Sequence, residues 1–190
     1  NNAVLGYDPV RKQTVLFGGQ GNDGYLSDTW LWTGTGWELL SPEHSPRPRS
    51  GASIAYDPTR GELVLFGGMG NSWEGYGGTF NDTWAWDGTD WVQKAPLNAP
   101  FPRIGASMAF DQGTGQMMLF GGDRPLSGPY PYWYYGYCFD YNYWFYLSLN
   151  DTWTWNGSDW TQQFPQTVPP ARSFGVMQFD VASGRLILSA

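Results

Sequence analysis

The chain has 190 residues, a formal net charge of −7 and only 14% charged residues. This length fits one ordinary domain or at most two small ones, and the negative charge disfavours nucleic acid and anionic membrane surfaces as partners. No stretch of about 18 apolar residues occurs, so we expect no membrane insertion. The 26 Gly, 14 Pro, 12 Trp and 12 Tyr favour short strands joined by tight turns, and they predict an all-β protein.

Four short sequence blocks recur in the same order along the chain, which indicates a repeat architecture. The first is an aromatic residue followed by Asp, and the second is an apolar run that ends in two glycines. The third reads Asp-Thr-Trp-x-Trp, and the fourth is one further Trp. The blocks occur at Tyr7-Asp8, Tyr56-Asp57, Phe110-Asp111 and Phe179-Asp180; at residues 16–19, 65–68 and 119–122; at residues 28–32, 82–86 and 151–155; and at Trp37, Trp91 and Trp160.

Each full unit predicts four short strands. In the second unit, residues 52–56 form a small apolar strand, and residues 63–66 form a β-rich run that stops at the glycine pair. Residues 83–86 alternate so that both tryptophans lie on one face of the pleat, and a turn then leads to a last strand at 91–93. The units of this single segment, 1–190, span about residues 3–40, 51–93 and 105–163, with two strands of a fourth unit at 174–188.

The pattern Asp-Thr-Trp-x-Trp-x-Gly-x-x-Trp, following a strand that ends in Gly-Gly, resembles the kelch-repeat family. The version here is similar to the repeats of large secreted or surface bacterial proteins, and distantly to the propeller of the galactose-oxidase group. The resemblance covers nearly the whole chain outside residues 123–149. It implies a kelch-type β-propeller of four-stranded antiparallel blades, with about three and a half blades present, at an extracellular or cell-surface location. Because a propeller ring has about four to eight blades, we expect a longer propeller or a protomer completed by another chain.

Twelve residues at repeated positions are predicted to be structural. The nine repeated tryptophans are expected to be buried, because their positions recur in every unit. An arginine lies eight residues before the repeated Asp in three units, where it is expected to brace neighbouring units through carbonyls or aspartates; a ring of arginines that binds a ligand is the alternative. The twelve are Trp30, Trp32, Trp37, Trp84, Trp86, Trp91, Trp153, Trp155, Trp160, Arg49, Arg103 and Arg172.

The loop after the glycine pair varies most between the units, with 8, 13 and 28 residues at 20–27, 69–81 and 123–150. Loops that vary on a constant scaffold commonly carry function. In the third loop, twelve of the residues from 130 to 146 are aromatic, and tyrosine supplies rigid contact area at low entropic cost. The candidate binding residues are Tyr130, Tyr132, Trp133, Tyr134, Tyr135, Tyr137, Tyr141, Tyr143, Trp144, Tyr146, Trp73 and Tyr76.

Three interpretations of this aromatic insert (residues 123–149) remain open. It contacts a protein partner or another copy of the chain, or it stacks on sugar rings of a glycan or on another small ligand. In the third interpretation it is structural, and folds back as a hairpin over the sheets or over an open edge.

Residues for catalysis are scarce. His44 is the only histidine, so neither a histidine-based triad nor a multi-histidine metal site is available. Cys138 is the only cysteine, so no internal disulfide forms, and a copper-radical oxidase would need two histidine ligands. We therefore expect no enzyme activity, no cofactor and no metal. Three glycosylation sequons occur, at Asn81, Asn150 and Asn156, but two of them fall within the repeated Asp-Thr motif.

The sequence therefore predicts a non-enzymatic extracellular module for recognition or assembly, which binds a protein partner or itself through the loop face and the aromatic insert. The first alternative is a structural subunit of a fibre, a stalk or a multichain ring. Further alternatives are a glycan-binding module, or a fragment of a larger propeller enzyme whose catalytic residues lie elsewhere.

Overall fold

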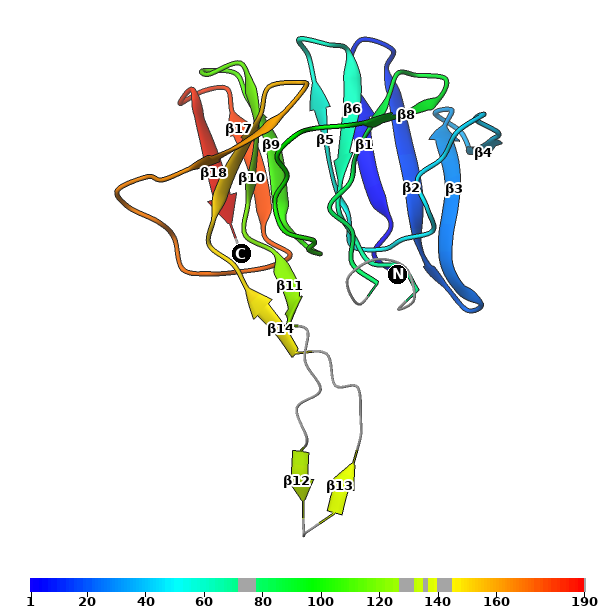
Figure 1. Cartoon of the computed structure of the whole chain (residues 1–190). Coiled ribbons are helices and arrows are strands. Elements are labelled where there is room, and N and C mark those ends of the chain that lie inside the picture. The colour runs from blue at the N-terminus through cyan, green and yellow to red at the C-terminus, as the bar shows by residue number, and fades with distance from the viewer. Residues whose placement is uncertain (72–77, 127–131, 135–136, 140–144, 190) are drawn as a thin grey trace.

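The computed structural model describes residues 1–71, 78–126, 132–134, 137–139 and 145–189; for 132–134, 137–139 and 145 only the backbone is described (Figure 1). All regular secondary structure in these residues is β-strand, which confirms the all-β prediction. The described residues contain no helix, and hence none that is long and apolar enough to cross a membrane.

Three sheets of four antiparallel strands follow one another along the chain, and a two-stranded sheet follows them. Within each of the four sheets the strands pair in chain order, and the insert lies between the second and third strands of the third sheet. The first sheet contains β1 (Val4–Asp8), β2 (Gln13–Gly21), β3 (Gly24–Trp32) and β4 (Trp37–Leu40); the second β5 (Ser53–Asp57), β6 (Glu62–Phe66), β7 (Thr83–Trp86) and β8 (Trp91–Lys94); the third β9 (Ser107–Asp111), β10 (Gln116–Phe120), β15 (Thr152–Trp155) and β16 (Trp160–Gln163); and the fourth β17 (Val176–Asp180) and β18 (Arg185–Ser189).

Most strand boundaries agree with the repeat pattern to within two residues, but the first variable loop differs. Residues 20–27 were expected to be loop, whereas β2 and β3 extend as a ribbon that pairs as far as Gly21 and Gly24. The tip is Asn22-Asp23 followed by Gly24 at φ 128°, a conformation that suits glycine. Asn22 and Asp23 form the two-residue turn of a hairpin, so most of the shortest variable loop is strand.

The glycine pairs have a defined role at the ends of the second strands. Gly67 adopts φ 69°, and a Cβ atom there would lie 2.8 Å from the carbonyl oxygen of Arg103. Its neighbour Gly68 donates its backbone N–H to that same carbonyl, at 2.9 Å. The equivalent hydrogen bonds join Gly19 to Arg49 and Gly122 to Arg172. The pair therefore lets the link to the next sheet approach the strand closely and hydrogen-bond to it.

The first strands of the four sheets pack against one another in chain order, from β1 to β5, β9 and β17. Backbone hydrogen bonds just before these strands continue the series, from Gly51 N–H to the Asn2 carbonyl, from Gly105 to Gly51 and from Phe174 to Gly105. Among the described elements, β17 does not contact β1. The sheets therefore form an ordered series that does not close into a ring.

A hydrophobic core fills each of the two interfaces between full sheets. Between the second and third sheets, Phe66 packs edge-on against Trp160, with 5.1 Å between ring centroids. Trp160 in turn packs against Trp155 and donates its Nε1–H to Thr83 Oγ1 at 2.9 Å. Between the first and second sheets, the same contacts join Phe17 to Trp91 (5.1 Å), Trp91 to Trp86 (5.4 Å), and Trp91 Nε1–H to Thr29 Oγ1 (3.0 Å).

The prediction that all nine repeated tryptophans are buried is confirmed for four of them and is wrong for two, which are exposed. Trp86, Trp91, Trp155 and Trp160 are at most 2% exposed, whereas their counterparts in the first sheet, Trp32 and Trp37, are 39% and 45% exposed. The physical reason is that a preceding sheet covers this pair in the second and third sheets, and no described sheet precedes the first. The other three, Trp30, Trp84 and Trp153, are half-buried.

Candidate functional site

The base of the aromatic insert is a two-stranded ribbon. β11 (Asp123–Leu126) pairs with β14 (Phe145–Ser148) over four residues, starting directly after the glycine pair of the third sheet. Beyond it, β12 (Tyr132–Tyr134) pairs with β13 (Tyr137–Phe139), and Figure 1 shows this pair lying away from the four sheets. Ser148 Oγ–H donates to Asp123 Oδ1 at 2.7 Å and fastens the start of the ribbon. The described backbone thus leads the insert outward from the molecule.

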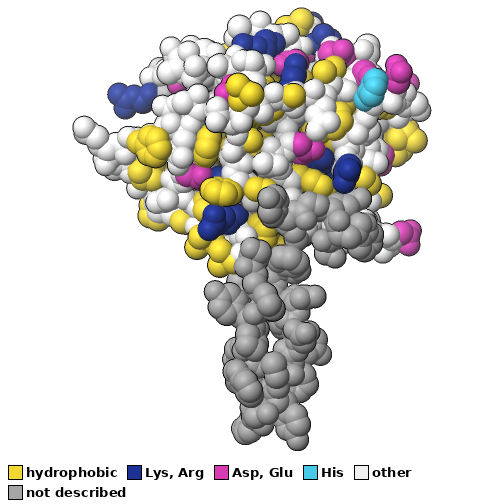
Figure 2. Space-filling view, in the orientation of Figure 1, with side chains coloured by type: hydrophobic (Ala, Val, Ile, Leu, Met, Phe, Trp, Pro, Cys, Tyr) yellow, Lys and Arg dark blue, Asp and Glu magenta, His cyan; other side chains and the backbone are white. Residues whose placement is uncertain are grey.

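The side chain of Tyr146 is the one candidate binding side chain that the structure describes. It is 40% exposed, and its hydroxyl lies 3.1 Å from the sulfur of Met69, in the second variable loop. Burial raises the pKa of Tyr146. Tyr132, Trp133, Tyr134 and Tyr137 are described by their backbone alone, and Tyr130, Tyr135, Tyr141, Tyr143, Trp144, Trp73 and Tyr76 lie outside the described residues. Hydrophobic side chains border the base of the insert (Figure 2).

Two of the three repeated arginines are buried braces, but each acts within its own sheet and does not join neighbouring units as predicted. Arg103 is 1% exposed and forms two hydrogen bonds with the carboxylate of Asp151, at 2.6 and 2.8 Å. It also donates to the carbonyl of Gly121 at 2.8 Å. Burial raises the pKa of Asp151, but the hydrogen bonds and charge of Arg103 outweigh it and hold this pKa below its usual value. Arg49 makes the same contacts with Asp82 and Gly67.

The third arginine, Arg172, departs from this pattern. It keeps the hydrogen bond from Nε–H to the carbonyl two residues earlier, here Pro170, at 3.2 Å. No described carboxylate pairs with its guanidinium group, and the side chain is only half-buried. A brace through a carbonyl and an aspartate therefore forms for two arginines, within a unit and not between neighbouring units, and the third arginine makes only a carbonyl contact. A ring of arginines around a ligand is not formed, because each brace lies within its own sheet.

A second set of arginines, which the repeat analysis missed, links the sheets at the opposite end of the strands. Arg11 donates to Asp8 Oδ2 at 2.6 Å and to the carbonyl of Gly61 in the second sheet at 2.8 Å. Arg60 likewise donates to Asp57 and to the carbonyl of Asn156 in the third sheet. The signal in the sequence is an arginine three residues after the repeated Asp.

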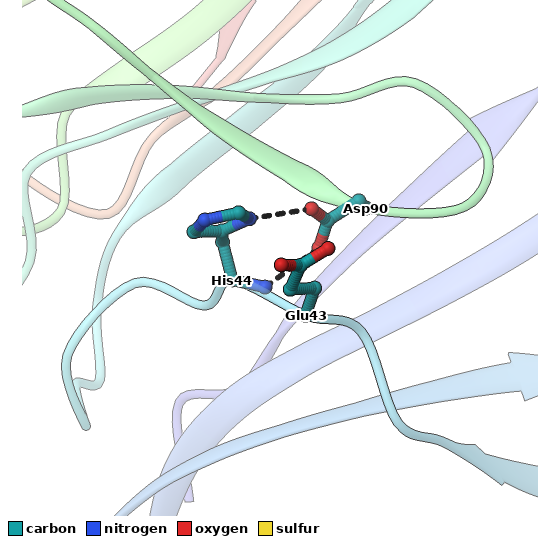
Figure 3. A group of neighbouring side chains, drawn as sticks. All are labelled: Glu43, His44 and Asp90. Atoms are coloured by element: carbon teal, nitrogen blue, oxygen red, sulfur yellow. Dashed lines mark hydrogen bonds and ion pairs between the residues drawn. The ribbon is translucent and has the colours of Figure 1, made fainter.

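The only histidine belongs to an exposed group with Glu43 and Asp90 (Figure 3). His44 donates its backbone N–H to Asp90 Oδ1 at 2.8 Å, and its ring Nδ1 lies 2.7 Å from Oδ2. The hydrogen bond and charge of Asp90 raise the pKa of His44. In the next repeat, Asn98 makes the corresponding pair of hydrogen bonds to Asp159. Since an amide takes the place of the imidazole there, the contact does not depend on histidine chemistry. It is a repeated structural contact between the segment that connects two sheets and the turn before a fourth strand.

Two further surfaces are open to solvent. A groove of about 450 Å³ runs between the first strands and is lined by uncharged residues from all four sheets, so its lining offers no acid or base. The second surface, which we call the open face, is the side of the first sheet with the uncovered tryptophan pair. Its members are exposed by 39–58%. They are Leu5, Tyr7, Trp32, Trp37 and Leu39.

No protein-family model matches the chain, and no curated protein matches its sequence.

Proposed function

We propose that this chain is a segment of a kelch-type β-propeller that acts outside the cell in recognition or assembly, without enzyme activity of its own. It binds a protein partner or a second copy of itself through the face from which the aromatic insert projects. The repeated four-stranded sheets and their ordered packing support the propeller, although the four sheets do not form a closed ring.

The observation that carries this proposal is the ribbon formed by β11 and β14. A structural insert would be expected to cover a sheet face, whereas the described strands β12 and β13 lie beyond this ribbon and away from the sheets (Figure 1). Presenting many tyrosines and tryptophans at the end of such a ribbon gives a large contact area with little loss of side-chain entropy on binding.

The test replaces Tyr132, Trp133, Tyr135 and Trp144 by Ser and follows binding and folding separately. A photo-crosslinking residue at position 137 should capture a partner, or a second copy, and the four substitutions should abolish this capture while leaving the far-ultraviolet circular dichroism unchanged. A crosslinker at Val10, which is 76% exposed in a turn at the opposite end of the strands, serves as the control. Capture that survives the four substitutions, or that is equal from position 10, contradicts the proposal.

A second candidate function, a subunit of a fibre, a stalk or a multichain ring, is favoured by the open face. At four of these five positions the equivalent residues of the second sheet, Ile54, Tyr56, Trp86 and Trp91, belong to the core or pack against it, so most of this face has the composition of an interface between sheets. Self-association in a sedimentation experiment that is abolished by Trp37→Glu, but not by the substitutions in the insert, supports this function. A chain that remains monomeric when its concentration is raised from about 1 μM to on the order of 100 μM contradicts this function.

A further inference from the structure

Three side chains that can ligate a metal ion meet at one point on the surface, and they come from two separate segments. Glu43 and His44 lie in the link between the first and second sheets, and Asp90 lies in the turn before β8 (Figure 3). One ligand atom from each of these side chains lies within 4.8 Å of the ligand atoms of the other two. We call Glu43, His44 and Asp90 the link–turn cluster.

The backbone on both sides of the cluster is held in place. In the link, the two members of the cluster stand between Pro42 and Pro46, and each proline fixes its own φ angle. In the turn, Asp90 donates its backbone N–H to Asp87 Oδ1 at 2.9 Å. His44 joins the two segments by donating its backbone N–H to Asp90 Oδ1 at 2.8 Å. The side chains of the cluster are therefore brought together by the fold itself, so little ordering is needed when an ion binds.

The ligand types in the cluster suit a divalent transition ion. Imidazole is a ligand for Zn²⁺ and related ions, whereas Ca²⁺ and Mg²⁺ prefer oxygen ligands throughout. Glu43 is exposed and enters no ion pair among the described residues, so its carboxylate is available to an ion. His44 Nδ1 lies 2.7 Å from Asp90 Oδ2. A zinc ion that takes the place of the proton between these atoms needs them about 3.3 Å apart, the separation of two tetrahedral ligands bound at about 2.0 Å.

The next repeat has the same framework without the metal ligands. Asn98 donates its backbone N–H and its side-chain N–H to the two carboxylate oxygens of Asp159, at 2.7 and 2.8 Å. Leu97, which is 95% exposed, stands where the first link has Glu43. The structural contact therefore needs neither an imidazole nor a glutamate. Both differences that set the first link apart supply a ligand for a metal ion.

We propose that Glu43, His44 and Asp90 form a binding site for one Zn²⁺ ion. The two carboxylates and the imidazole are its three protein ligands, and water takes the remaining position, since the His44 side chain is 63% exposed. The expectation of no metal rests on the lack of a second histidine, and this ligand set does not need one. The bound ion joins the link to the turn of the second sheet and stabilises the folded chain. The site does not involve the insert, so it goes beyond the recognition function proposed above.

The probe is ZnCl₂, added in a calorimeter to the full chain after treatment with a chelator. The native chain should bind one Zn²⁺ ion at this site, and excess Zn²⁺ should raise its Tm. Glu43→Gln and His44→Asn should each weaken binding by more than about tenfold, the lower end of the loss seen when a group that only orients a metal ligand is removed. Without zinc both variants should fold as the native chain does, because an amide makes the structural contact in the next repeat. Glu38→Gln, at an exposed position of β4 outside the cluster, is the matched control and should leave the affinity unchanged.

Two further measurements locate the ion. His44 is the only histidine, so the imidazole ¹⁵N signals in an NMR spectrum report on this site alone, and Zn²⁺ should shift the Nδ1 signal in the native chain and in the Glu38→Gln control. The second measurement transfers the site to the next repeat. The double variant Leu97→Glu, Asn98→His places the same ligands beside Asp159, and the number of bound ions should rise from one to two.

Four results would overturn the proposal. They are an absence of zinc binding by the native chain in millimolar ZnCl₂, equal affinities of the native, Glu43→Gln and His44→Asn chains, zinc binding that is abolished by Cys138→Ser, and a double variant that gains no second ion. The four Ser substitutions in the insert should leave the zinc affinity unchanged. Loss of partner capture in that variant therefore tests the recognition function alone, and the zinc titration tests the link–turn cluster alone.

Discussion

Replacing Trp160 by Ala should destabilise the chain much more than the same change at Trp37, although both residues occupy the same position in their repeats. Trp160 is 1% exposed, and its removal opens a cavity beside Phe66, which costs about 3–5 kcal/mol for a buried Trp. It also leaves the buried hydroxyl of Thr83 without its donor, which costs about 1 kcal/mol more. For a chain of this size, the total lowers Tm by on the order of 10–20 °C.

Trp37 is 45% exposed, and its main described ring contact is Trp32, itself on the open face. Much of its side chain is therefore already in water, and Trp37→Ala should lower the free energy of unfolding by only about 1–2 kcal/mol. The assay is urea unfolding followed by circular dichroism, repeated over a tenfold range of protein concentration. Equal losses for the two variants, at a concentration where sedimentation shows a monomer, would refute the view that a neighbouring sheet buries these tryptophans.

Three further predictions concern single contacts. Asp151→Asn should lower the free energy of unfolding by about 2–4 kcal/mol, because it leaves the buried guanidinium of Arg103 without its counter-charge. The folded pKa of Asp151 is lowered, so the stability that its carboxylate contributes is complete above the unfolded pKa and is lost as the pH falls through the folded pKa. The variant should therefore lose less stability in acid than the native chain does, in urea titrations at pH 3–6. His44→Asn should remove a pH dependence of the urea midpoint above about pH 6.5. The raised pKa of His44 makes the native contact fully stabilising below the unfolded pKa, and this stabilisation is lost as the pH rises through the folded pKa. Gly67→Ala should lower Tm more than Gly115→Ala does; both glycines have φ 69°, but only the first would place a Cβ against a backbone carbonyl, and equal losses measured by calorimetry would contradict this reasoning.

Much of the fold can be predicted from local sequence signals. The strands of the second sheet follow from alternation, from glycine pairs and from the turn at Asp87-Gly88, because each of these acts over a few residues. The burial of the tryptophans depends on a different property, namely whether another sheet lies beside them. The repeat pattern is identical for Trp37 and Trp91, and only the packing of the sheets separates their 45% and 0% exposures.

The candidate sites are less accessible to sequence reasoning. The braces of Arg49 and Arg103 can be predicted because the residue type recurs at a fixed distance from the repeated Asp. The links made by Arg11 and Arg60 are harder to find, since the third unit has Thr114 at that position and the series is broken.

The interfaces between the sheets bear on whether a repeat unit can be duplicated or deleted without loss of packing. Each of the three four-stranded sheets presents a Phe and a Thr on one side and a tryptophan pair on the other, and the two sides fit the same counterparts at both described interfaces. A unit duplicated or deleted between two others therefore meets compatible neighbours without any compensating substitution.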